Sequence, residues 1–94
     1  MDNPSVDIWI SSVLSMVTGG RRNFQTVGSN VRESLDDLLE KVPALRVHLF
    51  DDTGALRPHI LLFVGDTDIR WLDSLEAGLK EGDTITVMQT VSGG

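Results

Sequence analysis

Apolar and polar side chains alternate in two short stretches near the start of the chain. In residues 6–11 every second position is apolar, and Trp9 lies among the intervening positions. This period of two predicts a strand that buries one face and turns Trp9 to the other. Residues 23–27 alternate in the same way after a glycine-rich turn at 18–22. We therefore expect residues 6–27 to form a β-hairpin with a long loop.

Residues 31–42 follow a helical period instead. Their apolar side chains fall on one stripe, which consists of Val31, Leu35, Leu38, Leu39 and Val42. Asn30 stands at the N-cap position with Glu33 three residues later, which is the spacing of a capping box. Pro43 ends the pattern because proline cannot continue a helix. The sequence predicts a helix here.

In the second half of the chain the pattern predicts the secondary structure of some segments and leaves that of others undecided. Residues 45–50 alternate but are short, so a strand and a short helix both remain open. Residues 59–64 are almost continuously apolar, which predicts a central buried strand. Residues 69–79 are irregular, and residues 84–89 alternate as a closing strand would. Four apolar residues of the irregular segment are expected to point inward: Trp71, Leu72, Leu75 and Leu79.

The order of these elements predicts an α+β fold. It is the order of a β-grasp (ubiquitin-like) domain, in which a mixed sheet carries one main helix on one face. The 94 residues, of which 40% are hydrophobic, suffice for one core and are too few for two. We expect a single β-grasp domain at residues 1–90 and a flexible tail at residues 91–94.

Charge and composition narrow the function. The chain has 8 Lys and Arg against 14 Asp and Glu, a net charge of −6, which opposes binding to nucleic acid or to an anionic membrane. It has no cysteine, which excludes disulfides and a thiol nucleophile. No apolar run approaches the roughly 20 residues of a membrane span. His48 and His59 have no cysteine beside them, and the acidic turns lack the ligand spacing of a calcium loop. We expect a cytoplasmic protein with protein partners and no metal site.

The chain ends in a pair of glycines, Gly93 and Gly94, preceded by Ser92. Glycine has no Cβ, so such an end can pass through a channel that is too narrow for other residues. The four residues from Val91 span on the order of 13 Å when extended. On its own, the pair is equally compatible with a frayed end or an engineered scar. As a site, it would place the chemistry on the main-chain carboxylate of Gly94.

Residues 56–70, 79–87 and 91–94 together resemble the ubiquitin-like sulfur carrier proteins, the superfamily of the molybdopterin synthase small subunit and the thiamine sulfur carrier. The resemblance covers residues 6–94. Its specificity lies in the combination of a turn, a hydrophobic closing strand and a terminal Gly-Gly at the matching interval. The Asp68-Ile69-Arg70 sequence and the insert before it are most similar to the branch of the cysteine-biosynthesis sulfur carrier.

This resemblance implies that an E1-like adenylating enzyme uses ATP to activate the carboxylate of Gly94. Sulfur from a persulfide donor or sulfurtransferase then displaces AMP and leaves a thiocarboxylate. Activation is needed because a free carboxylate, with a pKa of about 3.3–3.7, is ionised at neutral pH and is a poor electrophile. A sulfur-accepting biosynthetic enzyme would receive the sulfur for cysteine or another sulfur-containing metabolite. The chain would be a carrier and not an enzyme, with no bound cofactor and with Ser92 and Gly93 leading Gly94 into the partner's active site.

Alternation also predicts a docking face. Four apolar side chains are expected on the side of the sheet away from the helix: Trp9, Leu61, Phe63 and Met88. Exposed apolar patches with such residue types mark interaction sites. In the resembling family this helix-free face meets the activating enzyme. The alternative is that the 18–22 loop or the N-terminal residues cover the patch.

Two other functions remain open. The chain could be a ubiquitin-like modifier that is conjugated to lysines through Gly94, which also requires adenylation. It could also be a non-covalent β-grasp adaptor, which needs no free tail.

Overall fold

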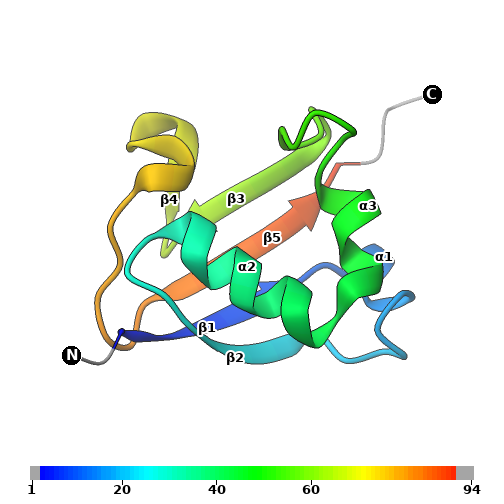
Figure 1. Ribbon diagram of the computed structural model, residues 1–94, viewed down its shortest axis with the longest axis horizontal. Helices are drawn as coiled ribbons and strands as arrows, with labels where there is room; N and C mark the ends of the chain where they lie inside the picture. The colour runs from blue at the N-terminus through cyan, green and yellow to red at the C-terminus, as the bar shows by residue number, and fades with distance from the viewer. Residues whose placement is uncertain (1–2, 91–94) are drawn as a thin grey trace.

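A five-stranded mixed sheet organises the protein (Figure 1). The computed structural model describes residues 3–90. The strands are β1 (Ser5–Ile10), β2 (Asn23–Val27), β3 (Ile60–Val64), β4 (Thr67–Asp68) and β5 (Thr84–Gln89). Their order is β2-β1-β5-β3-β4, and β1 and β5 are parallel while the other neighbours are antiparallel. The predicted hairpin, closing strand and β-grasp order are confirmed.

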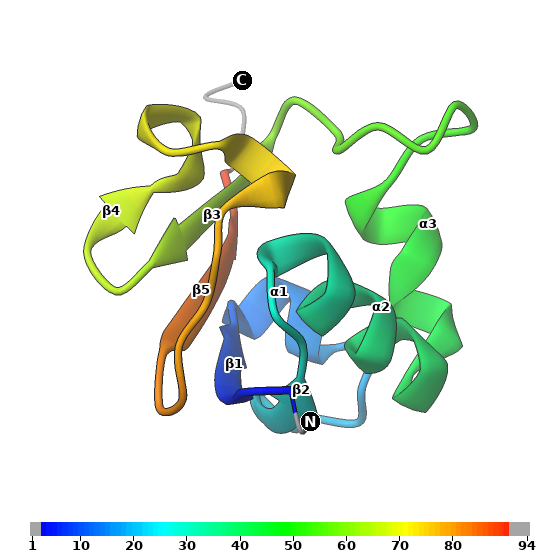
Figure 2. The same ribbon diagram turned by 60° about the vertical axis from the view of Figure 1, so that its left-hand side comes forward.

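One main helix, α2 (Val31–Lys41), packs on one face of the sheet as predicted, and the short α3 (Arg46–Leu49) lies on the same side (Figure 2). A further short helix, α1 (Ser12–Ser15), lies in the connection between β1 and β2. Three 3-10 turns complete the elements: η1 (Pro43–Leu45), η2 (Ile69–Trp71) and η3 (Ser74–Glu76). Within residues 3–90, every helix falls short of the length and apolar content that a membrane span requires.

The start of α2 is held by two neighbouring side chains. The N–H of Glu33 donates to Oδ1 of Asn30 at 2.8 Å, as the predicted cap requires. The Glu33 carboxylate accepts from the N–H of Ser29, one residue before the cap, at 2.8 Å. The first bond satisfies a backbone donor that the first turn of a helix leaves without an intrahelical partner, and the second ties the residue before the cap to that turn. The helix ends at Lys41, and Pro43 opens the following 3-10 turn.

The core lies between the sheet and α2. Val6, Ile8, Ile85 and Val87 are fully buried on the helix side of the two middle strands. The helix contributes the apolar stripe predicted from its period, with Val31, Leu35 and Leu38 fully buried, Leu39 2% exposed, and its last member, Val42, partly buried. These side chains belong to one cluster with Leu14, Leu45, Leu49, Leu62 and other buried apolar residues.

The helix begins close against the end of β2. A Cβ built on Gly28 would lie 2.5 Å from the backbone nitrogen of Ser34, so no larger residue fits without moving the helix. At the same residue, the hydroxyl of Ser34 lies 2.6 Å from that of Thr26, which also donates to the carbonyl of Val6. These buried polar groups satisfy one another inside the core.

The undecided segment 45–50 is mainly helical, because α3 covers Arg46–Leu49. The inward direction predicted for Leu79 is confirmed, and Leu75 packs partly against the core. The prediction was wrong for Trp71 and Leu72, which are 83% and 42% exposed. The reason is η2. This single turn directs Ile69 into the core, and the residues at its end, Trp71 and Leu72, are left in contact with solvent.

The apolar run around β3 forms a strand as predicted, but this strand does not occupy the middle of the sheet. It lies between β5 and the two-residue β4, and β5 has the central position. Its side chains alternate, with Ile60 and Leu62 buried and Leu61 and Phe63 half-buried. The strand therefore has one face in the core and one face toward the open side.

Candidate functional site

The four side chains predicted for the open side of the sheet do lie together there. In the sheet register Trp9 is paired with Thr86, and Thr86 is paired with Phe63. In the next register position on this face, Leu61 is paired with Met88. Paired residues of neighbouring strands lie on the same face, so β1, β5 and β3 contribute to one surface. We call Trp9, Leu61, Phe63 and Met88 the open-face patch.

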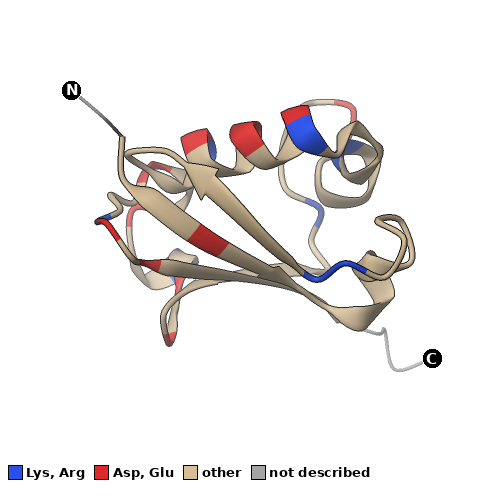
Figure 3. Cartoon of the chain, turned by 90° about the horizontal axis from the view of Figure 1, so that it is seen from below, with Lys and Arg blue, Asp and Glu red and all other residues tan. Residues whose placement is uncertain are grey.

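This patch is accessible. Trp9 is 47% and Met88 45% exposed, while Leu61 and Phe63 are half-buried. The loop at 18–22 therefore does not cover Trp9. Charged residues are concentrated on α2 and on the loops, and the strands carry few of them (Figure 3). The predicted face is confirmed, and its use in docking stays a prediction.

A hollow of about 280 Å³ adjoins Trp9 and Met88. Its other walls come from the chain just after β1, at Ser11 and Ser12, and from Arg22. The Arg22 guanidinium is exposed but positioned, because its Nε donates to the carbonyl of Ile10 at 3.0 Å. Sequence patterns did not reveal this hollow, although the arginine pair at 21–22 was a signal of a cationic loop. The open-face patch thus has a polar, cationic rim at one end.

The chain leaves the sheet next to this patch. Thr90, the last described residue, follows β5 and is tied to the residue before β3. Its N–H and its hydroxyl both donate to the carbonyl of His59, at 2.8 and 3.1 Å. The predicted tail residues Ser92, Gly93 and Gly94 lie outside the described residues. The described part of the chain therefore fixes where the tail begins.

The carboxylates with perturbed ionisation serve the fold. Hydrogen bonds from the N–H and hydroxyl of Ser29 lower the pKa of Glu33. Partial burial works against the ionised form of Asp37, but bonds from Lys41 and from the N–H of Val27 outweigh it and lower the pKa of this carboxyl. The side-chain hydrogen bonds from Arg70 lower the pKa of Asp68, and the same bonds, with the charge of Asp68, raise the pKa of Arg70. None of these groups belongs to the open-face patch.

Metal-binding residues do not gather in the described structure. Between residues 3 and 90, no three His, Asp or Glu side chains come close enough together to hold an ion. The chemical features of the site are therefore an apolar surface, a cationic rim and the beginning of the tail.

Comparison with known proteins identifies relatives over most of the chain. A family model described as the ThiS family matches residues 14–94. The sulfur carrier protein CysO of Mycobacterium tuberculosis is 26% identical over 92 residues, which cover 96% of this chain and 99% of that protein. Ubiquitin-related modifier 1 of Laccaria bicolor is 32% identical over 80 residues, or 85% of this chain and 66% of that protein.

Solved structures show the same fold. A chain in the crystal structure of the Amycolatopsis orientalis BexX/CysO complex superposes with a TM-score of 0.85 at 32% identity, over 95% of this chain and 99% of that one. SAMP1 of Haloferax volcanii superposes with a TM-score of 0.84 at 27% identity, over 96% and 99%. The β-grasp prediction and the resemblance to sulfur carriers close to CysO are confirmed.

Proposed function

This chain belongs to the ThiS family of ubiquitin-like sulfur carriers, and we propose that it carries sulfur on the carboxylate of Gly94. Its homologues are small carrier proteins that act as substrates and not as enzymes. In this proposal an E1-like adenylating enzyme, a sulfur donor and a sulfur-accepting enzyme act in turn on the same carboxyl group. ATP and the sulfur source are bound by these partners.

The chemistry follows from the poor reactivity of a carboxylate. A Gly94 oxygen attacks the α-phosphorus of ATP, and pyrophosphate leaves, which gives an acyl-adenylate. The terminal sulfur of a persulfide then attacks the acyl carbon, and AMP leaves with the former carboxylate oxygen. A thiol cleaves the resulting S–S bond and releases the thiocarboxylate, while the donor and the thiol are left as a disulfide. The carrier supplies no acid or base of its own to these steps.

One observation carries the proposal: the open-face patch adjoins the point where the chain leaves β5. Trp9 and Met88 are nearly half exposed, and Met88 lies two residues before Thr90. Four residues, 91–94, follow Thr90 and end in Gly94, and they span at most on the order of 13 Å. An enzyme that docks on the patch would have its adenylation site within that reach. Ser92 and Gly93, which are small, would then lead Gly94 into the site.

The patch has the composition of a protein interface. Trp and Met are enriched at the cores of such interfaces, and Arg is enriched with them. The hollow beside Trp9 offers a cavity for a partner side chain, with Arg22 at its rim. The solved complex of BexX with CysO supports the idea that a protein of this family binds a partner protein. We assign the open-face patch to the adenylating enzyme.

The similarity to CysO favours cysteine as the product into which the sulfur passes, and the acidic chain without cysteine fits a cytoplasmic role. A second function is favoured by the relatives that are named as modifiers, ubiquitin-related modifier 1 and SAMP1. In that case a lysine amine would attack the acyl carbon of the Gly94 adenylate, AMP would leave, and an isopeptide bond would form.

Intact-mass measurement separates the two functions. The full chain is incubated with an E1-like adenylating enzyme, ATP and a persulfide donor. A mass gain equal to the exchange of one oxygen for one sulfur supports the carrier, and lysine-linked ladders support the modifier. Deletion of Gly94 should abolish both products. Sulfur on a side chain, or products that survive the deletion, would refute the assignment to Gly94.

A further inference from the structure

The chain offers two side-chain amines to an activated carboxyl group, those of Lys41 and Lys80. Both residues lie in the described part of the chain, and both are exposed. An acyl-adenylate is attacked by a neutral amine, because an ammonium has no lone pair to donate. The two lysines therefore compete for any Gly94 adenylate that sulfur does not take up.

Lys41 is held at the end of α2. Its Nζ donates to the carbonyl of Gln25 at 2.7 Å and to Oδ2 of Asp37 at 3.0 Å. A charged donor makes such bonds stronger than a neutral one does, so both acceptors favour the ammonium form. An attack by Lys41 would have to break both bonds and remove the positive charge that faces Asp37. This lysine therefore serves the contact between the helix and the edge of the sheet.

Lys80 stands at the tight turn before β5, and only its backbone groups are needed there. The N–H of Lys80 donates to Oδ2 of Asp83 at 2.8 Å, and the N–H of Asp83 donates to the carbonyl of Lys80 at 3.0 Å. Gly82 supplies the positive φ of the turn, at 86°. Among residues 3–90, no acidic side chain forms an ion pair with Nζ of Lys80. The turn thus fixes the backbone of Lys80 and leaves its amine in solvent.

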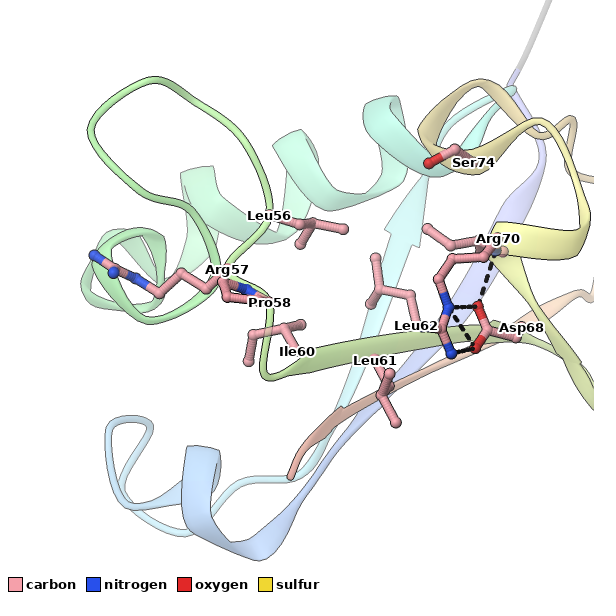
Figure 4. A pocket seen from close by; sticks show the side chains of 10 residues that line it. Leu56, Arg57, Pro58, Ile60, Leu61, Leu62, Asp68, Arg70 and Ser74 are labelled. Carbon is pink, nitrogen blue, oxygen red and sulfur yellow. Dashed lines mark hydrogen bonds and ion pairs between the residues drawn. The ribbon is translucent and has the colours of Figure 1, made fainter. Parts of the chain in front are cut away.

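Apart from the two lysines, the positive charges of the chain are arginines, whose guanidinium groups stay protonated. A groove of about 360 Å³ beside β3 contains two of them (Figure 4). Apolar residues from β3, from the segment before it and from η2 form most of its lining. Nε of Arg57 donates to the carbonyl of Val47 at 2.7 Å, and Arg70 is ion-paired with Asp68 at 2.7 Å. The lining residues of this groove therefore offer no amine to Gly94.

The length of β5 separates Lys80 from the tail of its own chain. The turn at 80–83 precedes β5 and Thr90 follows it, so the two lie at opposite ends of the sheet (Figure 1). The strand from Asp83 to Thr90 spans about 23 Å at ~3.3 Å per residue. Residues 91–94 span at most on the order of 13 Å, and they would have to run back along the strand. A bond between Gly94 and Lys80 therefore joins two copies of the chain.

We infer that Lys80 is the amine that accepts Gly94 of a second copy of this chain. The neutral Nζ of Lys80 attacks the acyl carbon of the Gly94 adenylate, and the C–N bond forms as the C–O bond to AMP breaks. AMP leaves with that oxygen, and the surplus proton of the amine passes to water. The linked product keeps a Gly94 at one end and a Lys80 at the other, so it can grow further. The inference rests on the adenylation of Gly94, which both proposed functions share, and adds the site that receives the carboxyl group.

Chemical acylation compares the two amines without any enzyme. The folded full chain is treated briefly with an acetylating N-hydroxysuccinimide ester, and peptide mass spectrometry quantifies each lysine. Lys80 should be acetylated at least about fivefold faster than Lys41, because Lys41 must first leave two acceptors. In urea, where the contacts of Lys41 are lost, the difference should disappear. Equal rates in the folded chain would overturn the inference.

Conjugation supplies a second readout. The full chain is incubated with an E1-like adenylating enzyme and ATP, with no sulfur donor. We expect a ladder in which, after digestion with trypsin, residues 81–94 of one copy remain attached to Lys80 of another. Lys80→Arg keeps the charge but removes the amine, and should abolish the ladder. The matched variant Lys41→Arg should leave it unchanged, and melting curves show whether both variants fold.

Four results of this experiment contradict the inference. They are a ladder that survives Lys80→Arg, attachment at Lys41 or at the N-terminal amine, a cyclised single chain, and the release of pyrophosphate without any ladder. The last result would leave the adenylation of Gly94 intact and remove only Lys80 as its acceptor. If no pyrophosphate is released, the proposed function itself fails, and the inference fails with it.

Discussion

The two faces of the sheet use neighbouring residues of the same strands for opposite purposes. On the helix side Ile85 and Val87 are fully buried beneath α2. On the open side, on strands next to each other, Trp9 and Met88 keep 47% and 45% of their surface in water. A shift of one residue along a strand therefore moves a side chain from the core to the proposed docking surface. Stability and binding can be changed separately because the strand alternates.

The largest effect is expected on the helix side. Ile85→Ala should lower the free energy of unfolding by about 2–5 kcal/mol, because it removes buried methyl groups and leaves a cavity. The neighbouring substitution Thr86→Ala, on the half-buried open side, should change it by less than about 1 kcal/mol. Urea unfolding of both variants measures the difference. Equal losses would show that the open side contributes to the core.

A smaller effect, on binding alone, is expected on the open side. Trp9→Ala should weaken binding to the adenylating enzyme about tenfold or more, since exposed tryptophans at interface centres carry much of the binding energy. The matched control is Trp71→Ala, which removes the same side chain from a site 83% exposed and outside the patch. Titration calorimetry and melting curves compare the two. A drop in melting temperature for Trp9→Ala without a loss of affinity would contradict the proposed docking face.

The smallest effect tests what holds the helix to the sheet edge. Asp37 accepts from the N–H of Val27 at 2.9 Å and from Lys41 at 3.0 Å, which links α2 to β2. Asp37→Asn keeps an acceptor but removes the charge, and should cost about 1 kcal/mol of unfolding free energy at pH 7.

This cost should depend on pH. The folded pKa of Asp37 is lowered, so its contribution is present above the unfolded pKa of about 3.9 and is lost as the pH falls through the folded pKa. Urea unfolding from pH 7 down to strongly acidic pH should therefore show the two proteins converging. The exposed neighbour Asp36→Asn should change stability by less than about 0.5 kcal/mol. A constant difference across the pH range would rule out a contribution from the charge.

Sequence patterns correctly predicted the elements whose apolar residues fit either the helical period or the strand period, but not both. The stripe of α2 and the alternation of β1 are of this kind. The segment 45–49 fits both a helical and a strand period. Leu45 and Leu49 are four residues apart, as on one face of a helix, and together with Val47 they also make every second residue apolar, as in a strand. Val47 distinguishes the two: a strand would bury it beside Leu45 and Leu49, whereas a helix turns it away from them. It is 64% exposed, as a helix requires. That exposure depends on tertiary packing, which a local pattern does not contain.

Part of the candidate site was also predictable. The face of Trp9, Leu61, Phe63 and Met88 followed from alternation alone. The groove beside β3 did not, because it is made by distant segments around Leu56 and Ile69 and by the cap at Asp68. The same cap explains why Trp71 was placed inward in error. A single hydrogen bond that ends a strand cannot be recognised from hydrophobicity.

The position of β5 links folding to synthesis. Among the elements described between residues 3 and 90 this strand comes last in the chain, yet both β1 and β3 pair with it. A nascent chain that stops before Thr84 lacks the middle of its sheet, and the two halves on either side have no common partner. The fold can close only after the ribosome has released residues 84–89, and long-range pairing of this kind is slow to form. Incomplete chains therefore cannot assemble the open-face patch.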